Sequence, residues 1–355
     1  MGRTTDRLRS MAGGGGVRLL LASSVLLHLG LAGCGDVGGP VVNVYSHRHY
    51  DTDQALFDRF AETTGIRVRV VSASADELIA RLEREGDASP ADVLITVDAG
   101  RLHRAKERGL LRPVESRILS NSIPPHLRDP DGYWFGLTQR ARILAYARDR
   151  VDATRLTDYE SLTHPEWEGR ILTRSSENIY NVSLLASIVA VHGSDGATEW
   201  ARGVVANFAR PPRGNDTDQI RDVAAGVGDV AIVNTYYIGR LLNAEDEASR
   251  ELVGNIGIIF PNQGGRGTHI NVSGAGVTAH APNPEHALEL LEFMVSEEAQ
   301  RAFAEANFEY PVREDIRWAP ALEDWGTFQT DTLSLERLGE LNNDAVIIFD
   351  RVGWR

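Results

Sequence analysis

The pattern of apolar and polar positions predicts alternating strands and helices in the first part of the chain. Short apolar runs at residues 41–45, 66–71 and 91–97 have the length and the β-branched content of buried strands. Between them, residues 52–64 and 76–85 place apolar side chains at helical spacing. Strands that alternate with helices are typical of βαβ units and a parallel sheet. Ligands of such sheets bind beyond the carboxyl ends of the strands, so we expect the loop after the first strand to line a site.

The rest of the chain continues this mixture. Residues 134–146 contain a strand that we expect to cross from one lobe to another, and residues 230–233 predict a short buried strand. Two further strands, at residues 256–260 and 274–279, are expected to lead back to the first lobe. The expected helices are residues 182–191, 199–208, 216–225, 284–294 and 296–306. About 320 residues exceed what one small core organises, which favours two lobes.

The first 33 residues indicate a secretory leader. Four arginines precede the apolar residues 19–29, a run shorter than the roughly 20 apolar residues of a membrane-spanning helix. The sequence Leu-Ala-Gly-Cys that ends at Cys34 resembles a bacterial lipobox, which implies cleavage before the cysteine and a lipid on its thiol. We therefore expect a lipoprotein signal peptide at residues 1–33 and a tether at residues 34–40. The mature protein is expected at the periplasmic or outer face of a membrane.

Composition and motifs exclude several classes of protein. Cys34 is the only cysteine, which leaves no intrachain disulfide and no cysteine-based metal site. Removal of residues 1–33 changes the formal net charge from −13 to −16, and such an acidic chain is a poor match for nucleic acid. An acid–base group at His47, His49 and Asp51 can be imagined, but the chain has no Gly-x-Ser-x-Gly, no His-Glu-x-x-His and no cysteine nucleophile in its mature part. We expect a binding protein and not an enzyme.

Three separate stretches carry tyrosines that we expect to meet in one cleft. Tyr236 and Tyr237 stand where an apolar strand gives way to a helix, Tyr50 follows the first strand, and Tyr180 precedes an apolar helix. Tyrosinate is a hard anionic oxygen that suits a hard trivalent cation, whereas zinc, calcium and magnesium prefer other ligands. One hypothesis is therefore a ferric-iron site with these phenols and His49. The other is that each ring is half-buried with a satisfied hydroxyl.

Several segments resemble the signature segments of the periplasmic ferric-iron-binding proteins of ABC transporters, the FbpA/FutA family. They include Tyr-Ser-His-Arg-His-Tyr-Asp-Thr-Asp at residues 45–53, Ser-Glu-Asn-Ile-Tyr-Asn at residues 176–181 and Asn-Thr-Tyr-Tyr-Ile-Gly-Arg at residues 234–240. Further matches lie at residues 133–142, at Leu-Asn-Asn-Asp-Ala-Val of residues 341–346, and at the closing Asp-Arg-Val-Gly-Trp. The likeness covers nearly all of the mature chain.

The resemblance implies a two-lobed α/β fold of the class II periplasmic binding proteins, with crossing hinge strands and a ligand cleft between the lobes. On that fold we assign residues 41–139 and 267–317 to lobe 1, and residues 140–266 and 318–355 to lobe 2. The implied ligands of ferric iron are Tyr50, Tyr180, Tyr236 and Tyr237, with His49, which coordinates in some members.

The resemblance also implies a role for arginines. Arg140 resembles a cleft arginine that faces the metal or a companion anion such as carbonate, since a guanidinium fork suits carbonate. Arg142 and Arg240 are weaker candidates for the same role. His47 departs from the small polar residue expected at its position, which points to an altered environment or an extra ligand.

The resulting prediction is a monomeric, lipid-anchored binding protein that delivers ferric iron to an inner-membrane ABC permease. One alternative is a protein of the same fold for another solute, such as an oxyanion, thiamine or a polyamine. Another is a sensor that reports iron without transporting it.

Overall fold

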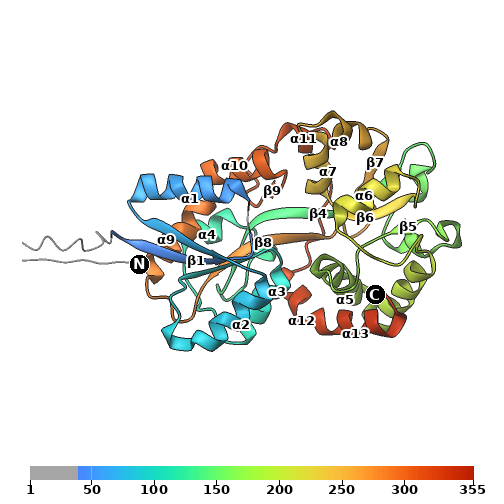
Figure 1. Cartoon of the computed structure of the whole chain (residues 1–355). Coiled ribbons are helices and arrows are strands. Elements are labelled where there is room, and N and C mark those ends of the chain that lie inside the picture. Colours follow the sequence, from blue (N-terminus) through green and yellow to red (C-terminus); the bar gives the residue numbers. More distant parts are fainter. Residues whose placement is uncertain (1–38, 49) are drawn as a thin grey trace, which may run out of the picture. The chain divides into compact units, whose positions relative to one another are not determined.

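A mixed sheet of nine strands organises residues 39–48 and 50–355, which are the residues that the computed structural model describes (Figure 1). The strand order is β2-β1-β3-β8-β4-β6-β5, and both β7 and β9 pair with β4. The strands are β1 (Val41–Ser46), β2 (Arg67–Ser72), β3 (Val93–Thr96), β4 (Phe135–Ala147), β5 (Ile171–Leu172), β6 (Val230–Asn234), β7 (Ile256–Ile259), β8 (Ile270–Val277) and β9 (Tyr310–Pro311). The predicted signal peptide, Cys34 and His49 lie outside the described residues.

The direction of the strands changes along the sheet. β1 pairs in parallel with β2 and β3, as the alternation of strands and helices predicts. β8 runs antiparallel to β3 and to β4, and β4 runs antiparallel to β6 and β7. The expectation of parallel pairing from the first part of the chain is therefore confirmed for β1, β2 and β3. Beyond them, among the described strands, only β5 and β6 pair in parallel, and the other pairs are antiparallel. The reason is that the chain passes from the first half of the sheet to the second along β4 and returns along β8. Strand β8 therefore runs antiparallel to both of its neighbours, β3 and β4.

Strand β4 belongs to two halves of the sheet. Its residues up to Ala141 pair with β8, and its residues from Arg142 onward pair with β6. We call β1, β2, β3, β8, β9 and the part of β4 up to Ala141 the first half-sheet. The second half-sheet consists of the rest of β4 with β5, β6 and β7. A strand that crosses between two parts of the molecule is thus found where residues 134–146 predict one.

Helices cover both half-sheets (Figure 1). Helices α1, α2, α3 and α9 contact strands of the first half-sheet, and α6 and α7 contact strands of the second. The α-helices are α1 (Asp51–Thr64), α2 (Ala75–Glu85), α3 (Ala99–Glu107), α4 (Arg117–Ser122), α5 (Ile179–Ala206), α6 (Asp216–Ala224), α7 (Thr235–Leu242), α8 (Glu247–Leu252), α9 (Pro284–Met294), α10 (Glu297–Asn307), α11 (Pro320–Glu323), α12 (Leu335–Glu340) and α13 (Asn342–Val352). Short 3-10 helices span Gly86–Ala88, Pro125–Leu127, Ala153–Arg155, Glu160–Thr163 and Pro165–Trp167.

Local sequence explains where several helices begin and end. Ser74 and Glu77 form a reciprocal capping box at the start of α2. Helix α1 ends at Gly65, whose φ of 76° is the left-handed conformation that glycine adopts without strain. Gly193, with φ of 68°, interrupts α5. The two helices predicted around it are therefore present, one on each side of the break within α5.

The C-terminal segment touches both halves of the molecule. Helix α12 packs on α3 and α5, and α13 packs on α5. The approach of α12 to α3 is close, because a side chain at Gly339 would overlap His103. Trp354 closes the segment by packing against Trp200 and Phe208. The predicted division into two lobes stays a prediction. The C-terminal segment contacts elements assigned to both predicted lobes, α3 in lobe 1 and α5 in lobe 2.

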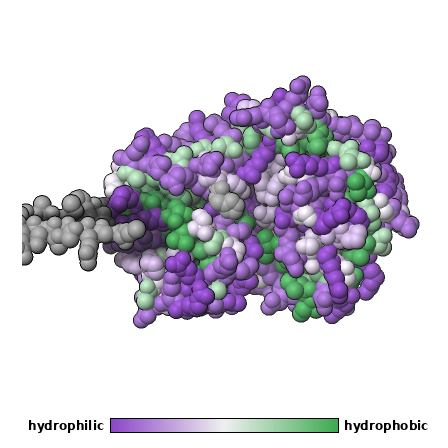
Figure 2. Space-filling view, viewed as in Figure 1, coloured by the Kyte–Doolittle hydropathy of each residue, from purple (hydrophilic) through white to green (hydrophobic). Residues whose placement is uncertain are grey.

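The face seen in Figure 2 is mostly hydrophilic, with smaller apolar areas between charged side chains. None of the helices in residues 39–48 and 50–355 has the length and apolar character needed to span a bilayer.

Candidate metal centre

The four predicted tyrosines line one cavity of about 370 Å³. Tyr180 stands in the first turn of α5, Tyr236 and Tyr237 in the first turn of α7, and Tyr50 directly before α1. The Tyr180 and Tyr236 hydroxyl oxygens are 3.4 Å apart. The rings of Tyr236 and Tyr237 stack with centroids 4.2 Å apart. The structure thus brings together the phenols that the sequence singles out, and their role as ligands stays a prediction.

Local structure explains why these phenols face the cavity. Every residue of β6 is buried, so the strand carries the chain to the edge of the sheet and α7 begins at the next residue. Asn178 caps α5, and its side chain accepts a hydrogen bond from the Tyr180 N–H at 3.2 Å. Both helix N-termini point positive dipole ends toward this region, which favours oxygen anions there.

All three predicted arginines contact these phenols, and Arg142 does so with its guanidinium 5.9 Å from the centre of the Tyr180 ring. The guanidinium of Arg240 lies 4.7 Å from the centre of the Tyr50 ring and 5.3 Å from that of Tyr236, so it stands between phenols from different parts of the chain. Arg140 is 2% exposed and lies 5.2 Å from the centre of the Tyr180 ring. Positive charge at these distances offsets the charge that phenolates would carry.

The hydrogen bonds of Arg140 restrict how it can hold an anion. Its Nη1 donates to Ser273 Oγ at 2.9 Å and lies 3.5 Å from Glu309 Oε1, and its Nη2 donates to the Val272 carbonyl at 3.0 Å. A companion anion would therefore share this guanidinium with the protein. Arg142 is also buried, at 2% exposure, and is not among the residues that line the tyrosine cavity.

A buried ion-pair network lies beneath Tyr50. Arg48 Nε and Nη2 each donate to one Asp53 carboxylate oxygen at 3.0 Å, and Nη1 donates to Glu309 Oε2 at 3.1 Å. The guanidinium also lies 4.8 Å from the centre of the Tyr50 ring. Because Glu309 also faces Arg140, this carboxylate connects the support of Tyr50 with the arginine over Tyr180.

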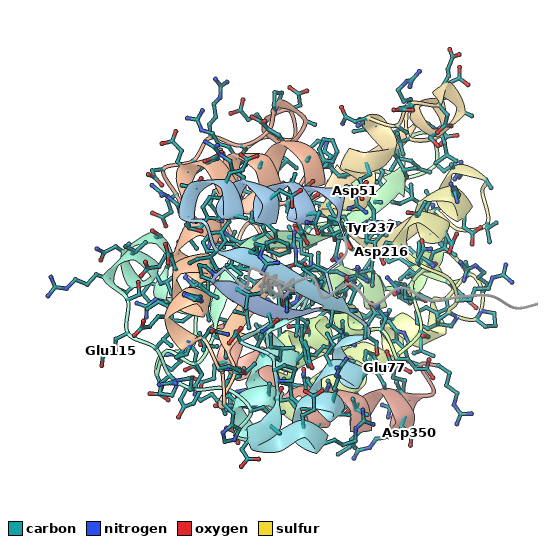
Figure 3. The ribbon with its side chains drawn as sticks, turned by 60° about the vertical axis from the view of Figure 1, so that its left-hand side comes forward. Asp51, Glu77, Glu115, Asp216, Tyr237 and Asp350 are labelled. Atoms are coloured by element: carbon teal, nitrogen blue, oxygen red, sulfur yellow. The ribbon has the colours of Figure 1, made fainter. Side chains whose placement is uncertain are left out.

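Burial raises the pKa of three of the four phenols. For Tyr50, the next cause after burial is the Glu309 carboxylate. For Tyr236, it is the neighbouring phenol of Tyr180. Burial and then the Asp216 carboxylate raise the pKa of Tyr237 to about 12. Figure 3 shows Tyr237 near Asp216. These phenols keep their protons at neutral pH until a cation replaces them.

The sequence analysis missed several residues of the cavity wall. Arg48, Arg101, Arg174 and Glu177 line it together with the predicted tyrosines, and so does His47. Two of them carried a usable signal. Arg101 stands in the first turn of α3, just after β3, and Arg174 follows β5, so both lie at strand ends where ligands are expected. Among the described residues, no group of three histidines, cysteines or carboxylates is arranged to hold a metal ion. A metal in this cavity would therefore rely on the phenols.

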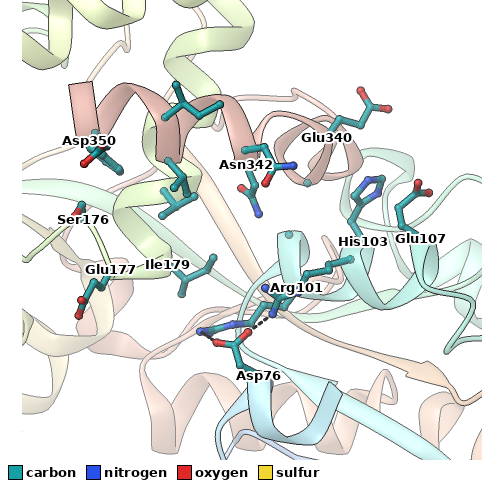
Figure 4. Close-up of a pocket in the computed structure, with 18 of the residues that line it drawn as sticks. Asp76, Arg101, His103, Glu107, Ser176, Glu177, Ile179, Glu340, Asn342 and Asp350 are labelled. Atoms are coloured by element: carbon teal, nitrogen blue, oxygen red, sulfur yellow. Dashed lines mark hydrogen bonds and ion pairs between the residues drawn. The ribbon is translucent and has the colours of Figure 1, made fainter. Parts of the chain in front are cut away.

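A larger cavity of about 1080 Å³ adjoins the first one (Figure 4). It lies among α3, the start of α5 and the C-terminal helices, and it shares Arg101, Glu177 and Ile179 with the tyrosine cavity. Arg101 pairs there with Asp76 at 3.4 Å. The chemistry differs from that of the smaller cavity, because none of the residues that line the larger one is a tyrosine.

Comparisons with known proteins agree along nearly the whole described chain. A family model described as bacterial extracellular solute-binding protein matches residues 55–330. The iron uptake protein A1 of Synechocystis sp. is 48% identical over 314 residues, which cover 88% of this chain and 87% of that protein. A FutA (IdiA) structure from Trichodesmium, in complex with iron and citrate, is 49% identical with a TM-score of 0.86 and covers 89% of this chain and 100% of its own. The apo FutA2 structure from Synechocystis is 49% identical with a TM-score of 0.85. The match covers 90% of this chain and 100% of the FutA2 chain.

Proposed function

The chain belongs to the family of bacterial extracellular solute-binding proteins, and from this premise we propose that it captures ferric iron outside the cytoplasm and passes it to an ABC permease. The two-lobed solute-binding fold expected from the sequence is confirmed by the solved structures. The expectation of a transport protein and not an enzyme is confirmed by the relatives.

One observation carries the choice of ferric iron. Tyr50, Tyr180, Tyr236 and Tyr237 line a single cavity, with two of their hydroxyl oxygens 3.4 Å apart. Phenolate oxygens suit a hard trivalent cation better than a divalent one. The relatives support the same cargo, because they are named for iron uptake or hold iron in their structures. We assign these four phenols as ligands, with His49 as a further candidate.

Titration of the apo-protein with ferric citrate tests the assignment. We expect a visible charge-transfer band from phenolate to iron, which saturates at one iron per protein. Tyr180→Phe should weaken binding and reduce the band. The matched control is Tyr133→Phe, because Tyr133 contacts Lys106 and does not line the cavity. A protein that stays colourless and binds no ferric iron would refute the proposal.

The proposed cycle uses closure of the cleft. Tyr180, Tyr236 and Tyr237 belong to helices that follow the second half-sheet, whereas Tyr50 belongs to the first. We propose that iron first meets the three phenols and that closure brings up Tyr50. Iron favours the closed form only because it binds that form better. The crossing at β4 is a suitable hinge.

We also propose that Cys34 carries a lipid that holds the monomeric protein at a membrane. Support comes from the Leu-Ala-Gly-Cys sequence and the apolar run before it. A Cys34→Ser variant should appear in the soluble fraction of the cell envelope and should not incorporate labelled fatty acid. An unchanged distribution between membrane and soluble fractions would refute the anchor.

The arginines of the cavity bear on the alternatives. Arg48, Arg101, Arg174 and Arg240 line it with a single carboxylate, from Glu177, which disfavours a polyamine. The same arginines favour an anion, so carbonate or a similar oxyanion is proposed as a companion of iron. Iron titrations with and without bicarbonate test this, and equal affinities would remove the companion anion.

A further inference from the structure

Arg142 and Asp216 form a buried ion pair beside the tyrosine cavity. Arg142 Nη1 lies 2.7 Å from Asp216 Oδ2, and the two side chains are 2% and 0% exposed. Arg142 belongs to β4, and Asp216 is the first residue of α6. Neither residue lines the cavity itself. The Arg142 guanidinium nevertheless lies 5.9 Å from the centre of the Tyr180 ring, so the pair stands directly behind the phenols. A pair that is buried at this cost in that place needs an explanation.

One arm of the pair holds the segment that carries Tyr180. Arg142 Nη2 donates to Asn181 Oδ1 at 2.8 Å, and Asn181 directly follows the tyrosine. The side-chain nitrogen of Asn181, Nδ2, donates in turn to the backbone carbonyls of Arg174 and Ser175 at 2.8 and 3.2 Å. The first turn of α5 is therefore tied to β4 through one side chain.

The other arm holds the segment that carries Tyr236 and Tyr237. Arg142 Nη1 donates to Asn234 Oδ1 at 3.2 Å, and the Asn234 N–H donates to Asp216 Oδ2 at 2.8 Å. Asn234 is the last residue of β6 and precedes α7. One ion pair thus fixes the chain next to Tyr180 and just before the adjacent phenols.

We propose that Arg142 and Asp216 are positioning residues, which set the spacing of the three phenol oxygens before iron arrives. The inference rests on the proposed ferric-iron function and adds to it a pair that is not assigned as a ligand. Replacement of a side chain that orients metal ligands without contacting the metal typically lowers metal affinity by roughly 10- to 100-fold. The same range is expected here.

A positioning role and a purely electrostatic role predict different signs for the change in iron affinity when each partner is replaced. Asp216→Asn removes a negative charge, and Arg142→Gln removes a positive charge, at nearly the same place. If the pair acted only through its field, these variants would change the iron affinity in opposite directions. If the pair positions the phenols, both variants weaken binding.

The chain offers a matched control for lost stability. Asp216 is held by Arg142 and, at 3.4 Å, by Arg174 Nη1. Asp229 is likewise held by two arginines, with Arg150 Nε and Arg170 Nε each at 2.7 Å, and it lies just before the opposite end of β6. The experiment measures the ferric iron affinity, by competition with citrate, and the position of the charge-transfer band. We expect Asp216→Asn and Arg142→Gln each to lose roughly 10- to 100-fold in affinity and to shift the band. Asp229→Asn should change neither.

Opposite signs for Asp216→Asn and Arg142→Gln, unchanged affinity, or an equal loss in Asp229→Asn would each overturn the inference. If the ion-pair variants do not fold, Asn181→Ala removes one arm and keeps the pair. Its loss of affinity should disappear in a Tyr180→Phe background, and a full additional loss there would contradict the inference. A wild-type protein that binds no ferric iron refutes the proposed function itself, whereas iron-binding wild type with unaffected variants refutes only the positioning role.

Discussion

On one side of the tyrosine cavity, the first turns of α5 and α7 contribute three phenols. The ion pair of Arg142 and Asp216 holds the chain beside both of these turns. On the other side, the turn between β1 and α1 contributes Tyr50, held by the network of Arg48. The first side is assembled within the second half-sheet, because Tyr180 and Tyr236 already lie 3.4 Å apart at their hydroxyls. The second side shares Glu309 with the crossing strand through Arg140. From this comparison we infer that the first wall offers a cation three phenols at once, and we propose that the second wall completes the site.

Loss of the adjacent phenols should have the largest effect. In a Tyr236→Phe, Tyr237→Phe variant the stacked rings remain, but the better-assembled wall loses two of its three phenol oxygens. We expect iron binding to weaken by at least about 1000-fold, or about 4.1 kcal/mol, and the charge-transfer band to disappear. Equilibrium dialysis against ferric citrate measures the loss. A double variant that retains most of its affinity would show that the comparison is wrong.

The network under Tyr50 should matter most for stability. Arg48→Gln leaves Asp53 without its buried cation and Glu309 with Arg140 alone, at 3.5 Å, which should cost about 3–5 kcal/mol in the free energy of unfolding. Chemical denaturation of the apo-protein measures it. Arg59→Gln is the control, because Arg59 pairs with Glu298 at the surface, with its side chain 51% exposed, and such pairs contribute about 0–1 kcal/mol. Equal costs for both variants would contradict a structural role for the network.

The two walls should differ when one phenol is removed from each. Tyr180→Phe is expected to weaken iron binding by about 100-fold, or about 2.7 kcal/mol. Tyr50→Phe should cost about tenfold, or about 1.4 kcal/mol, because the three phenols of the first wall stay together, whereas Tyr180→Phe breaks up that wall. Citrate competition compares the variants under identical conditions. The proposed order of capture and closure requires this difference, and the reverse order of losses would exclude it.

The raised pKa values predict a count of released protons, and a single variant should change that count by only one. Tyr50, Tyr236 and Tyr237 are protonated in the apo-protein at neutral pH, so each releases one proton when it binds iron. Iron affinity should therefore fall as the pH falls, by up to about tenfold per pH unit for each such phenol. Calorimetry in buffers of different ionisation enthalpy counts the protons, after correction for citrate. Tyr237→Phe should release one proton fewer than wild type, and an unchanged count would exclude Tyr237 as a ligand.

The amino-acid sequence by itself determined the elements and the phenols. Periodicity placed seven of the nine described strands and most of the longer helices. Tyr50 and Tyr236 follow strands, where a local pattern is enough to expect a ligand. The sequence also indicated a crossing strand within residues 134–146, and β4 there pairs with strands of both half-sheets. These features depend on near neighbours in the chain, and their signals are therefore visible in short windows of sequence.

Only the tertiary structure decided how the phenols are held. Arg142 and Asp216 are 74 residues apart, and Arg48 and Glu309 are 261 apart, so no local pattern pairs them. The antiparallel return along β8 and the packing of α12 on α3 were likewise absent from the periodicity. Burial gives these contacts their strength, because an ion pair acts strongly only where water is excluded. That exclusion exists only after distant segments have packed together.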